Sequence, residues 1–283
     1  MSTRRMRYCS RPMVAVLATL LLLLTATPAA AQLYAAVLPA SRSVQIGQPA
    51  TAFATIINAG TATATGCHIV FPPGLPATFL FQTTNPTTNT LTGTANAPVD
   101  IPAGASQSFM FAATPTNIVR NSFVELTFSC DGQTAPHSTV NAWQLTATTG
   151  PTFDVLAIMA TENGDEATLT IPLDGTAALA VAMVNIGGAG VPAGFGLSVG
   201  TAPNLAVSIC ETNPNTGACL GPFPAAPQDI GVVHTYTIFA RSTGPILFSP
   251  SNTRVSIFVA FFDPLSMTMN QLFPLTSVAV RTP

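Results

Sequence analysis

Short apolar runs separated by polar turns follow one another along most of the chain after residue 31. Many are rich in Val, Ile, Phe and Thr, and Gly, Pro and Asn bound them, which is typical of β-strands. Clear examples are Ala50–Asn58, Ser106–Ala112, Phe123–Cys130, Ala178–Asn185, Val232–Ala240 and Arg254–Phe262. No segment after residue 31 shows the period of an amphipathic helix. The pattern predicts an all-β protein.

The runs and their turns predict how this β structure is organised. They arrive at the spacing of roughly 8–12 residues that is typical of β-sandwiches, with Gly, Pro and Asn between them. The segment 32–283 is long enough for two domains that each bury a core. We expect two tandem immunoglobulin-like β-sandwich domains, at 32–149 and 150–283, joined by a linker around Thr148–Thr152.

An internal repeat supports two domains. Ala54–Gly60 reads ATIINAG and recurs at Val181–Gly187 as VAMVNIG, a strand that enters an Asn-x-Gly turn. Two further matches join Ser108–Ala112 to Tyr236–Ala240 and Phe123–Asp131 to Arg254–Asp263. Three matches in the same order, offset by about 130 residues, indicate a duplicated sandwich and not a solenoid of short repeats.

The N-terminal 31 residues have the three parts of a secretory signal peptide. Four arginines come first, an apolar run from Met13 to Leu24 follows, and small residues end at Ala31 before Gln32. The apolar run is shorter than the roughly 20 residues of a membrane-spanning helix, and no longer run follows it. We therefore expect cleavage between Ala31 and Gln32. The mature protein is expected to be exported without a membrane anchor, to the periplasm, the cell surface or the medium.

Charge excludes one large class of partners. The chain after residue 31 has five Arg and no Lys, against eleven Asp and Glu, and the Arg residues are not clustered. Nucleic acids and anionic membrane surfaces are bound by basic patches, which this sequence lacks. We expect no nucleic-acid partner.

Four cysteines remain after signal cleavage, at positions 67, 130, 210 and 219. An even number in an exported chain with no C-x-x-C pair indicates two disulfides and not a metal site. The internal repeat indicates which cysteines pair. Cys67 and Cys130 both lack a counterpart in the second half, as a bonded pair would, so Cys67 is expected to pair with Cys130 and Cys210 with Cys219.

One motif resembles a catalytic site. Gly196–Gly200 reads GLSVG, which fits the G-x-S-x-G pattern of serine hydrolases, and Asp229 and His234 follow in the required order. The mechanism needs Ser198 on a sharp turn between a strand and a helix, but the sequence beyond it predicts another strand. We expect no catalytic residues and no enzyme activity, and a helix directly after Val199 would reverse this.

Metal and cofactor sites are not expected. His68, His137 and His234 match no metal-ligand spacing. Glu162–Glu166 gathers oxygen-bearing side chains at a turn, but has too few ligands for calcium and is favoured as a solvated hairpin turn. Whether this turn binds calcium stays open. The sole tryptophan, Trp143, is favoured as a core residue over a binding platform.

The first half also resembles a known type of repeat. Its motifs are Val44–Gly47, Ala52–Ile57, Asn58–Gly66 and Pro72–Leu75. They are similar to the immunoglobulin-like repeat of bacterial surface proteins, including the CARDB (cell adhesion related) type, which reads "strand, N-x-G-x-A-x-x, strand, L-P-x-G". Residues 37–112 fit well and 153–240 weakly. Two departures are the scrambled L-P-x-G order and the presence of two units instead of a long array.

That resemblance implies a role in cell-surface adhesion or structure. We therefore expect a non-catalytic extracytoplasmic binding or structural module, whose partner is a protein or another envelope component. One alternative is a β-sandwich that binds carbohydrate or a small ligand, which should show clustered aromatic side chains. A remote alternative is a serine hydrolase that uses Ser198.

Overall fold

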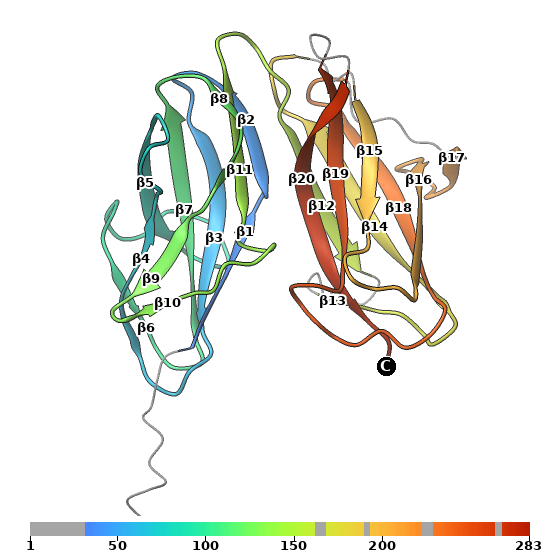
Figure 1. The fold of residues 1–283 in the computed structure, drawn as a ribbon, viewed down its shortest axis with the longest axis horizontal. Coiled ribbons are helices and arrows are strands. Elements are labelled where there is room, and N and C mark those ends of the chain that lie inside the picture. The colour runs from blue at the N-terminus through green and yellow to red at the C-terminus, as the bar shows by residue number, and fades with distance from the viewer. Residues whose placement is uncertain (1–31, 162–167, 190–192, 222–228, 264–267) are drawn as a thin grey trace, which may run out of the picture.

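The computed structural model describes residues 32–161, 168–189, 193–221, 229–263 and 268–283. Within these ranges all regular elements are β-strands, and they form two β-sandwiches that lie side by side (Figure 1). The expected all-β, immunoglobulin-like sandwich class is confirmed. The predicted signal peptide and its cleavage site at Ala31 lie at or before the start of the described residues.

The first sandwich packs one four-stranded sheet against a layer made of a three-stranded sheet and a second four-stranded sheet. The four-stranded sheet has the order β1 (Leu33–Leu38), β3 (Ala50–Asn58), β7 (Ser106–Pro115) and β5 (Ala77–Thr84). The facing layer contains β2 (Ser41–Gln45), β11 (Trp143–Thr148) and β8 (Val119–Val124), beside β10 (Gln133–Thr134), β9 (Thr127–Cys130), β4 (Ala64–Val70) and β6 (Val99–Ile101). Only the β2–β11 pair is parallel among the described strands of this sandwich.

The second sandwich repeats this connectivity. One sheet has the order β12 (Val155–Thr161), β14 (Thr176–Asn185), β18 (Val233–Ser242), β16 (Leu205–Thr212) and β17 (Cys219–Gly221). The facing sheet has the order β13 (Thr168–Thr170), β20 (Thr268–Arg281), β19 (Arg254–Asp263) and β15 (Ala193–Ser198). Here β13 runs parallel to β20, as β2 does to β11.

The Asn-x-Gly turn occupies the same place in both sandwiches, directly after β3 and after β14. Asn58 and Asn185 are fully buried, and their Oδ1 atoms accept hydrogen bonds from the backbone N–H groups of Gly60 (3.1 Å) and Gly187 (3.0 Å). Each side-chain amide nitrogen also donates to a carbonyl oxygen four residues further on. The buried amide is therefore satisfied, which explains why the repeat keeps asparagine. Gly187 has a second constraint, because a Cβ there would lie 2.3 Å from the Thr152 carbonyl oxygen.

Each sandwich buries its own hydrophobic cluster between its sheets. In β3 the buried positions alternate with more exposed ones, as in a strand that packs on one face. Trp143 is fully buried and packs edge-to-face on Phe111, with ring centroids 5.0 Å apart. The interpretation of Trp143 as a core residue is confirmed. The cluster of the second sandwich is built around Tyr236, Leu179 and Ile171.

One expected strand is wrong in its extent. Phe123–Cys130 is not continuous, because the chain leaves β8 after Val124 and begins β9 at Thr127. The physical reason is that β8 pairs with β11, whereas β9 pairs with β4, so the chain changes neighbours between them. The short strands β10 and β17 were not expected from the sequence.

Candidate functional site

A groove of about 900 Å³ lies between the two sandwiches. Its walls include β1 from the first sandwich and β12 from the second. Several lining side chains are apolar yet exposed: Tyr34 and Leu38 by 46%, Phe248 by 49% and Ile158 by 64%. The volume is at the upper end of the roughly 300–1,000 Å³ that is usual for ligand sites. This groove is therefore the main candidate for a binding site.

A buried ion pair fixes the junction beside this groove. Arg42 on β2 donates from Nε to Asp154 Oδ2 at 2.8 Å, and Asp154 Oδ1 accepts from the Ser43 backbone N–H at 3.0 Å. The guanidinium also donates to the carbonyl oxygen and the hydroxyl of Thr51. Because Asp154 directly precedes β12, the pair joins the linker of the second sandwich to the facing layer of the first. Ser41 adds a hydrogen bond to the Pro274 carbonyl oxygen at 2.7 Å.

The ion pair is costly in isolation, because both side chains are removed from water. Burial raises the pKa of Asp154 above its ordinary value of 3.8, and the charge of Arg42 and its hydrogen bonds oppose that rise. The side chains of Arg42 and Asp154 are only 10% and 5% exposed. The desolvation of both charges offsets much of their attraction, but removing either one would leave the other buried without its partner.

Arg254 lines the groove, and it has no carboxylate partner among the described residues. Arg254 on β19 donates to the Ser277 hydroxyl and carbonyl oxygens, both at 2.8 Å, and to the Pro250 carbonyl oxygen at 2.7 Å. All these acceptors are neutral, and burial lowers the pKa of Arg254. No Asp or Glu is among the described residues that line the groove. Among the described lining residues, the guanidinium of Arg254 is therefore a positive charge with no carboxylate beside it.

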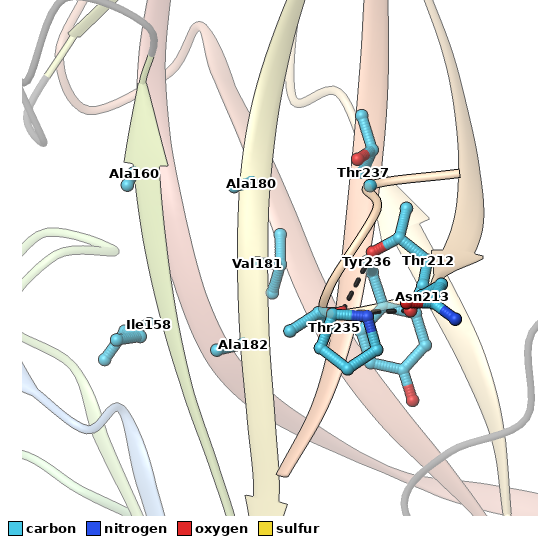
Figure 2. A pocket seen from close by; sticks show the side chains of 12 residues that line it. Ile158, Ala160, Ala180, Val181, Ala182, Thr212, Asn213, Thr235, Tyr236 and Thr237 are labelled. Atoms are coloured by element: carbon cyan, nitrogen blue, oxygen red, sulfur yellow. Dashed lines mark hydrogen bonds between the residues drawn. The ribbon is translucent and has the colours of Figure 1, made fainter. Parts of the chain in front are cut away.

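A smaller hollow of about 300 Å³ lies on the outer face of the second sandwich (Figure 2). Small side chains of β12 and β14 line it, including Ala160, Ala180 and Ala182. The Thr212 and Thr235 hydroxyls are hydrogen-bonded to each other at 3.0 Å. Tyr236 is the one aromatic residue among the described residues of the lining, and it is 1% exposed. The hollow therefore lacks the exposed aromatic platform of a typical sugar site.

The structure does not bring the hydrolase candidates together. After β15 the chain makes a turn and enters β16, so no helix follows Val199. Ser198 is exposed and pairs with Ser256, on the outer side of its sheet, since the neighbouring Ile257 faces the core. His234 is on the opposite sheet of the sandwich, where its Nδ1 lies 3.0 Å from Glu211 Oε1.

Both glycines of the G-x-S-x-G motif have structural roles. A Cβ at Gly196 would lie 1.7 Å from the ring of Phe258, which occupies that space. Gly200 has a φ of +59°, and a Cβ there would lie 2.2 Å from the Asn252 carbonyl oxygen. Packing and backbone conformation thus account for the motif without any catalytic role.

The remaining candidate residues are dispersed. His68 Nδ1 lies 2.7 Å from the Gly66 carbonyl oxygen, and His137 is exposed in the loop beside the groove. Among the described residues no three His, Cys, Asp or Glu side chains form a cluster suited to a metal ion. The Glu162–Glu166 turn lies outside the described residues.

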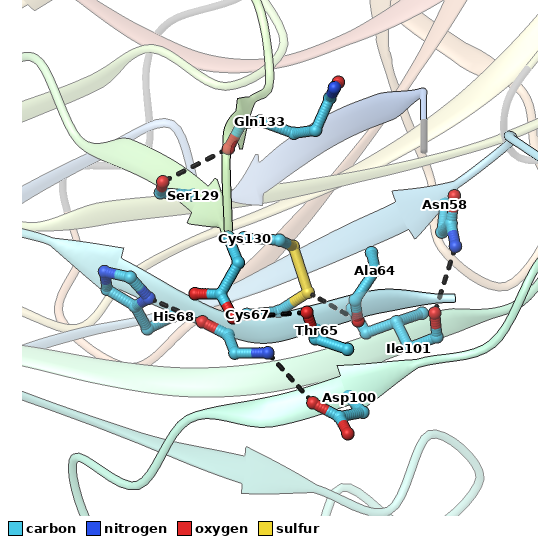
Figure 3. The surroundings of a disulfide bond; sticks show 12 residues. Asn58, Ala64, Thr65, Cys67, His68, Asp100, Ile101, Ser129, Cys130 and Gln133 are labelled. Atoms are coloured by element: carbon cyan, nitrogen blue, oxygen red, sulfur yellow. Dashed lines mark hydrogen bonds between the residues drawn. A yellow bond between two sulfur atoms is a disulfide. The ribbon is translucent and has the colours of Figure 1, made fainter. Parts of the chain in front are cut away.

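Two disulfides are present, and they are the pairs expected from the repeat. Cys67 on β4 bonds to Cys130 on β9, which joins neighbouring strands of one sheet (Figure 3). Cys210 on β16 bonds to Cys219 on β17 and closes the turn beside the hollow. Asp131, next to the first disulfide, accepts from the Thr65 hydroxyl at 3.2 Å.

Sequence reasoning missed the groove and the junction. The available signal was the isolated charge of Arg42 and of Asp154, each in an apolar or hydroxyl-rich segment of a chain with only 7% charged residues. Nothing in the sequence indicates that β1 and β12 lie on two sides of the same groove.

The described part of the chain contains no helix of the length and hydropathy that a membrane crossing requires. No protein-family model matches the sequence, and no curated protein matches it either.

Solved structures give only distant similarities. Domains 4 and 5 of the S-layer protein SbsC match at 12% identity and a TM-score of 0.23, over 60% of this chain and 69% of that one. The secreted serine protease VesC from Vibrio cholerae matches at 14% identity and 0.24, over 72% and 45%. A protein of unknown function from Porphyromonas gingivalis W83 matches at 11% identity and 0.24, over 88% and 98%. Scores this low assign no family.

Proposed function

We propose that this protein is a non-catalytic extracytoplasmic binding or structural module that engages a protein or another envelope component through the groove between its sandwiches. The observation that carries the proposal is the groove itself: it is large, its apolar side chains are exposed, and a buried ion pair holds its two walls in place. A groove whose walls are held in place binds a partner without the entropy cost of ordering those walls.

Location is part of the proposal. Disulfides persist in oxidising compartments, and this chain has two. The signal-like N-terminal segment and the resemblance of residues 37–112 to immunoglobulin-like repeats of bacterial surface proteins favour the periplasm or the cell surface.

The test uses the full chain, tagged at its C-terminus and expressed in the producing cells. We expect protein that begins at or near Gln32 outside the cytoplasm, and saturable binding of the purified protein to the envelope fraction. Arg42→Ala should weaken this binding because the two walls of the groove are no longer held together. The exposed Arg120→Ala is the matched control and should bind normally. Retention in the cytoplasm with Met1 intact, or equal binding by unfolded protein, would contradict the proposal.

A further inference from the structure

Both walls of the groove are edge strands. Among the described strands β1 pairs only with β3 and β12 only with β14, so each stands at the end of its sheet. An edge strand presents a row of backbone N–H and C=O groups with no partner in its own sheet. The hydrogen-bond pattern shows which residues of each strand present them.

On β12 the outward groups belong to Ala157 and Met159. The Ile186 N–H donates to the Asp154 carbonyl oxygen at 2.8 Å, so position 154 is bonded toward the neighbouring strand. Because antiparallel pairs alternate, Ile158 is bonded toward β14, and Ala157 and Met159 direct their backbone groups away from it. Met159 borders the groove, and the whole residue, backbone included, is 7% exposed.

The same reasoning applies to β1. The Ala59 N–H donates to the Gln32 carbonyl oxygen at 2.8 Å, so the odd-numbered residues direct their backbone groups outward. Val37 is consistent with this assignment of the odd-numbered residues, because its N–H donates away from β3, to the Val140 carbonyl oxygen at 2.8 Å. The loop around Val140 thus covers one end of β1. Ala35 forms no such bond within the described residues and borders the groove.

β12 has none of the features that usually protect an edge strand. It reads VLAIMAT, without a charged residue or a proline, and its pairing with β14 runs over seven residues with no bulge. Natural sheets protect their edges with lysine, proline, bulges or a covering segment. The first three are absent from β12, so a covering segment is the remaining option.

We propose that the groove binds an extended segment of a partner protein, which adds to β12 as a further strand and directs a carboxylate toward Arg254. This rests on the proposed binding function and specifies the partner. Strand addition obtains affinity from backbone hydrogen bonds and specificity from alternate side chains, which here would meet Ile158 and Tyr34. A volume of about 900 Å³ holds a short segment but not a second copy of a sandwich. The carboxylate follows from charge complementarity, because Arg254 has only neutral partners among the described residues.

The test selects binders from a phage library of random linear peptides on the disulfide-intact protein. We expect the enriched peptides to alternate apolar residues and to share an acidic one. Peptide binding should slow the exchange of the Ala157 and Met159 amides with solvent relative to the free protein. Converting the acidic residue of a peptide to its amide should weaken binding about tenfold or more, as loss of a charge-assisted hydrogen bond does.

Ile158→Lys places a charge on this edge and should weaken peptide binding at least about tenfold. Leu173→Lys is the matched control, since Leu173 is 55% exposed and does not line the groove. Failure to enrich any peptide, binding that survives Ile158→Lys, or unprotected amides in the complex would each overturn the strand-addition proposal. If the Ile158→Lys protein still binds the envelope fraction while Arg42→Ala does not, the proposed function stands and only the addition of a strand to β12 is refuted.

Discussion

Replacing Arg42 with alanine tests whether the buried ion pair governs the junction. The substitution removes the 2.8 Å contact to Asp154 and the hydrogen bonds to Thr51. Asp154 then keeps one hydrogen bond to the described residues through its side chain, from the Ser43 N–H. Its carboxylate stays buried without a cation, because the linker position is held by Asn185, which bonds the Asp154 backbone N–H at 3.1 Å.

The magnitude follows from that burial. Removing one partner of a buried ion pair costs about 3–5 kcal/mol, whereas an exposed pair contributes about 0–1 kcal/mol. At 10% and 5% side-chain exposure, Arg42 and Asp154 belong to the first case. The double variant Arg42→Ala with Asp154→Ala leaves no uncompensated charge, so it should be less destabilised than Arg42→Ala alone. This non-additivity is the signature of the pair.

The cost should also depend on pH. Burial raises the pKa of Asp154 in the folded protein, so this group contributes stability that is fully present below its ordinary pKa of 3.8 and is lost as the pH rises through the folded pKa. Removing Arg42 raises that pKa further, because its lowering influence is gone. The difference in unfolding free energy between wild type and Arg42→Ala should therefore be small in acid and grow toward neutral pH.

Urea unfolding followed by the fluorescence of Trp143 measures this directly, because it is the sole tryptophan and is fully buried in the first sandwich. Arg120→Ala, an exposed arginine in the same sandwich, is the control and should change stability by less than about 0.5 kcal/mol. Equal stability of Arg42→Ala and the control at neutral pH would refute the reasoning. So would a double variant that is less stable than Arg42→Ala.

Three further predictions concern other parts of the chain. A fluorophosphonate probe should leave Ser198 unlabelled in folded protein, because no helix follows its strand; stoichiometric labelling would restore the hydrolase hypothesis. Non-reducing peptide mapping should recover Cys67 linked to Cys130, and a peptide linking Cys67 to Cys210 would contradict the fold. Asn185→Ala should cost about 1–3 kcal/mol in thermal or urea unfolding, because backbone groups of the turn lose their buried partner; a neutral effect would show that the repeated asparagine is not needed for the turn.

Much of the fold could be predicted, because local pattern determines it. Ala50–Asn58 is expected as a strand and forms β3 with those bounds, since its alternating positions face core and solvent in turn. The internal repeat could be detected in the sequence because a buried asparagine occupies the same turn in each sandwich. The disulfide pairs were accessible for the same reason, since the repeat supplied a second copy for comparison.

Which strands pair when they are distant in the sequence could not be predicted from the local pattern. Phe123–Cys130 has a continuous strand pattern, yet the chain breaks where its neighbour changes from β11 to β4. Each segment satisfies the same local rule, and only the three-dimensional order of strands decides where one ends. The charges of Arg42 and Asp154 present the same difficulty, because an isolated charge in a sequence does not identify its partner.

The groove depends most strongly on this kind of information. Val155–Thr161 and Arg254–Phe262 are both apolar runs, and the sequence of each suits a central strand covered on both sides. The structure places β19 between β20 and β15 but leaves β12 at the end of its sheet, facing the groove. The same apolar pattern is therefore a core feature in one strand and an exposed edge in the other. That difference in position, rather than any motif, is why we propose β12 as the strand that binds another chain.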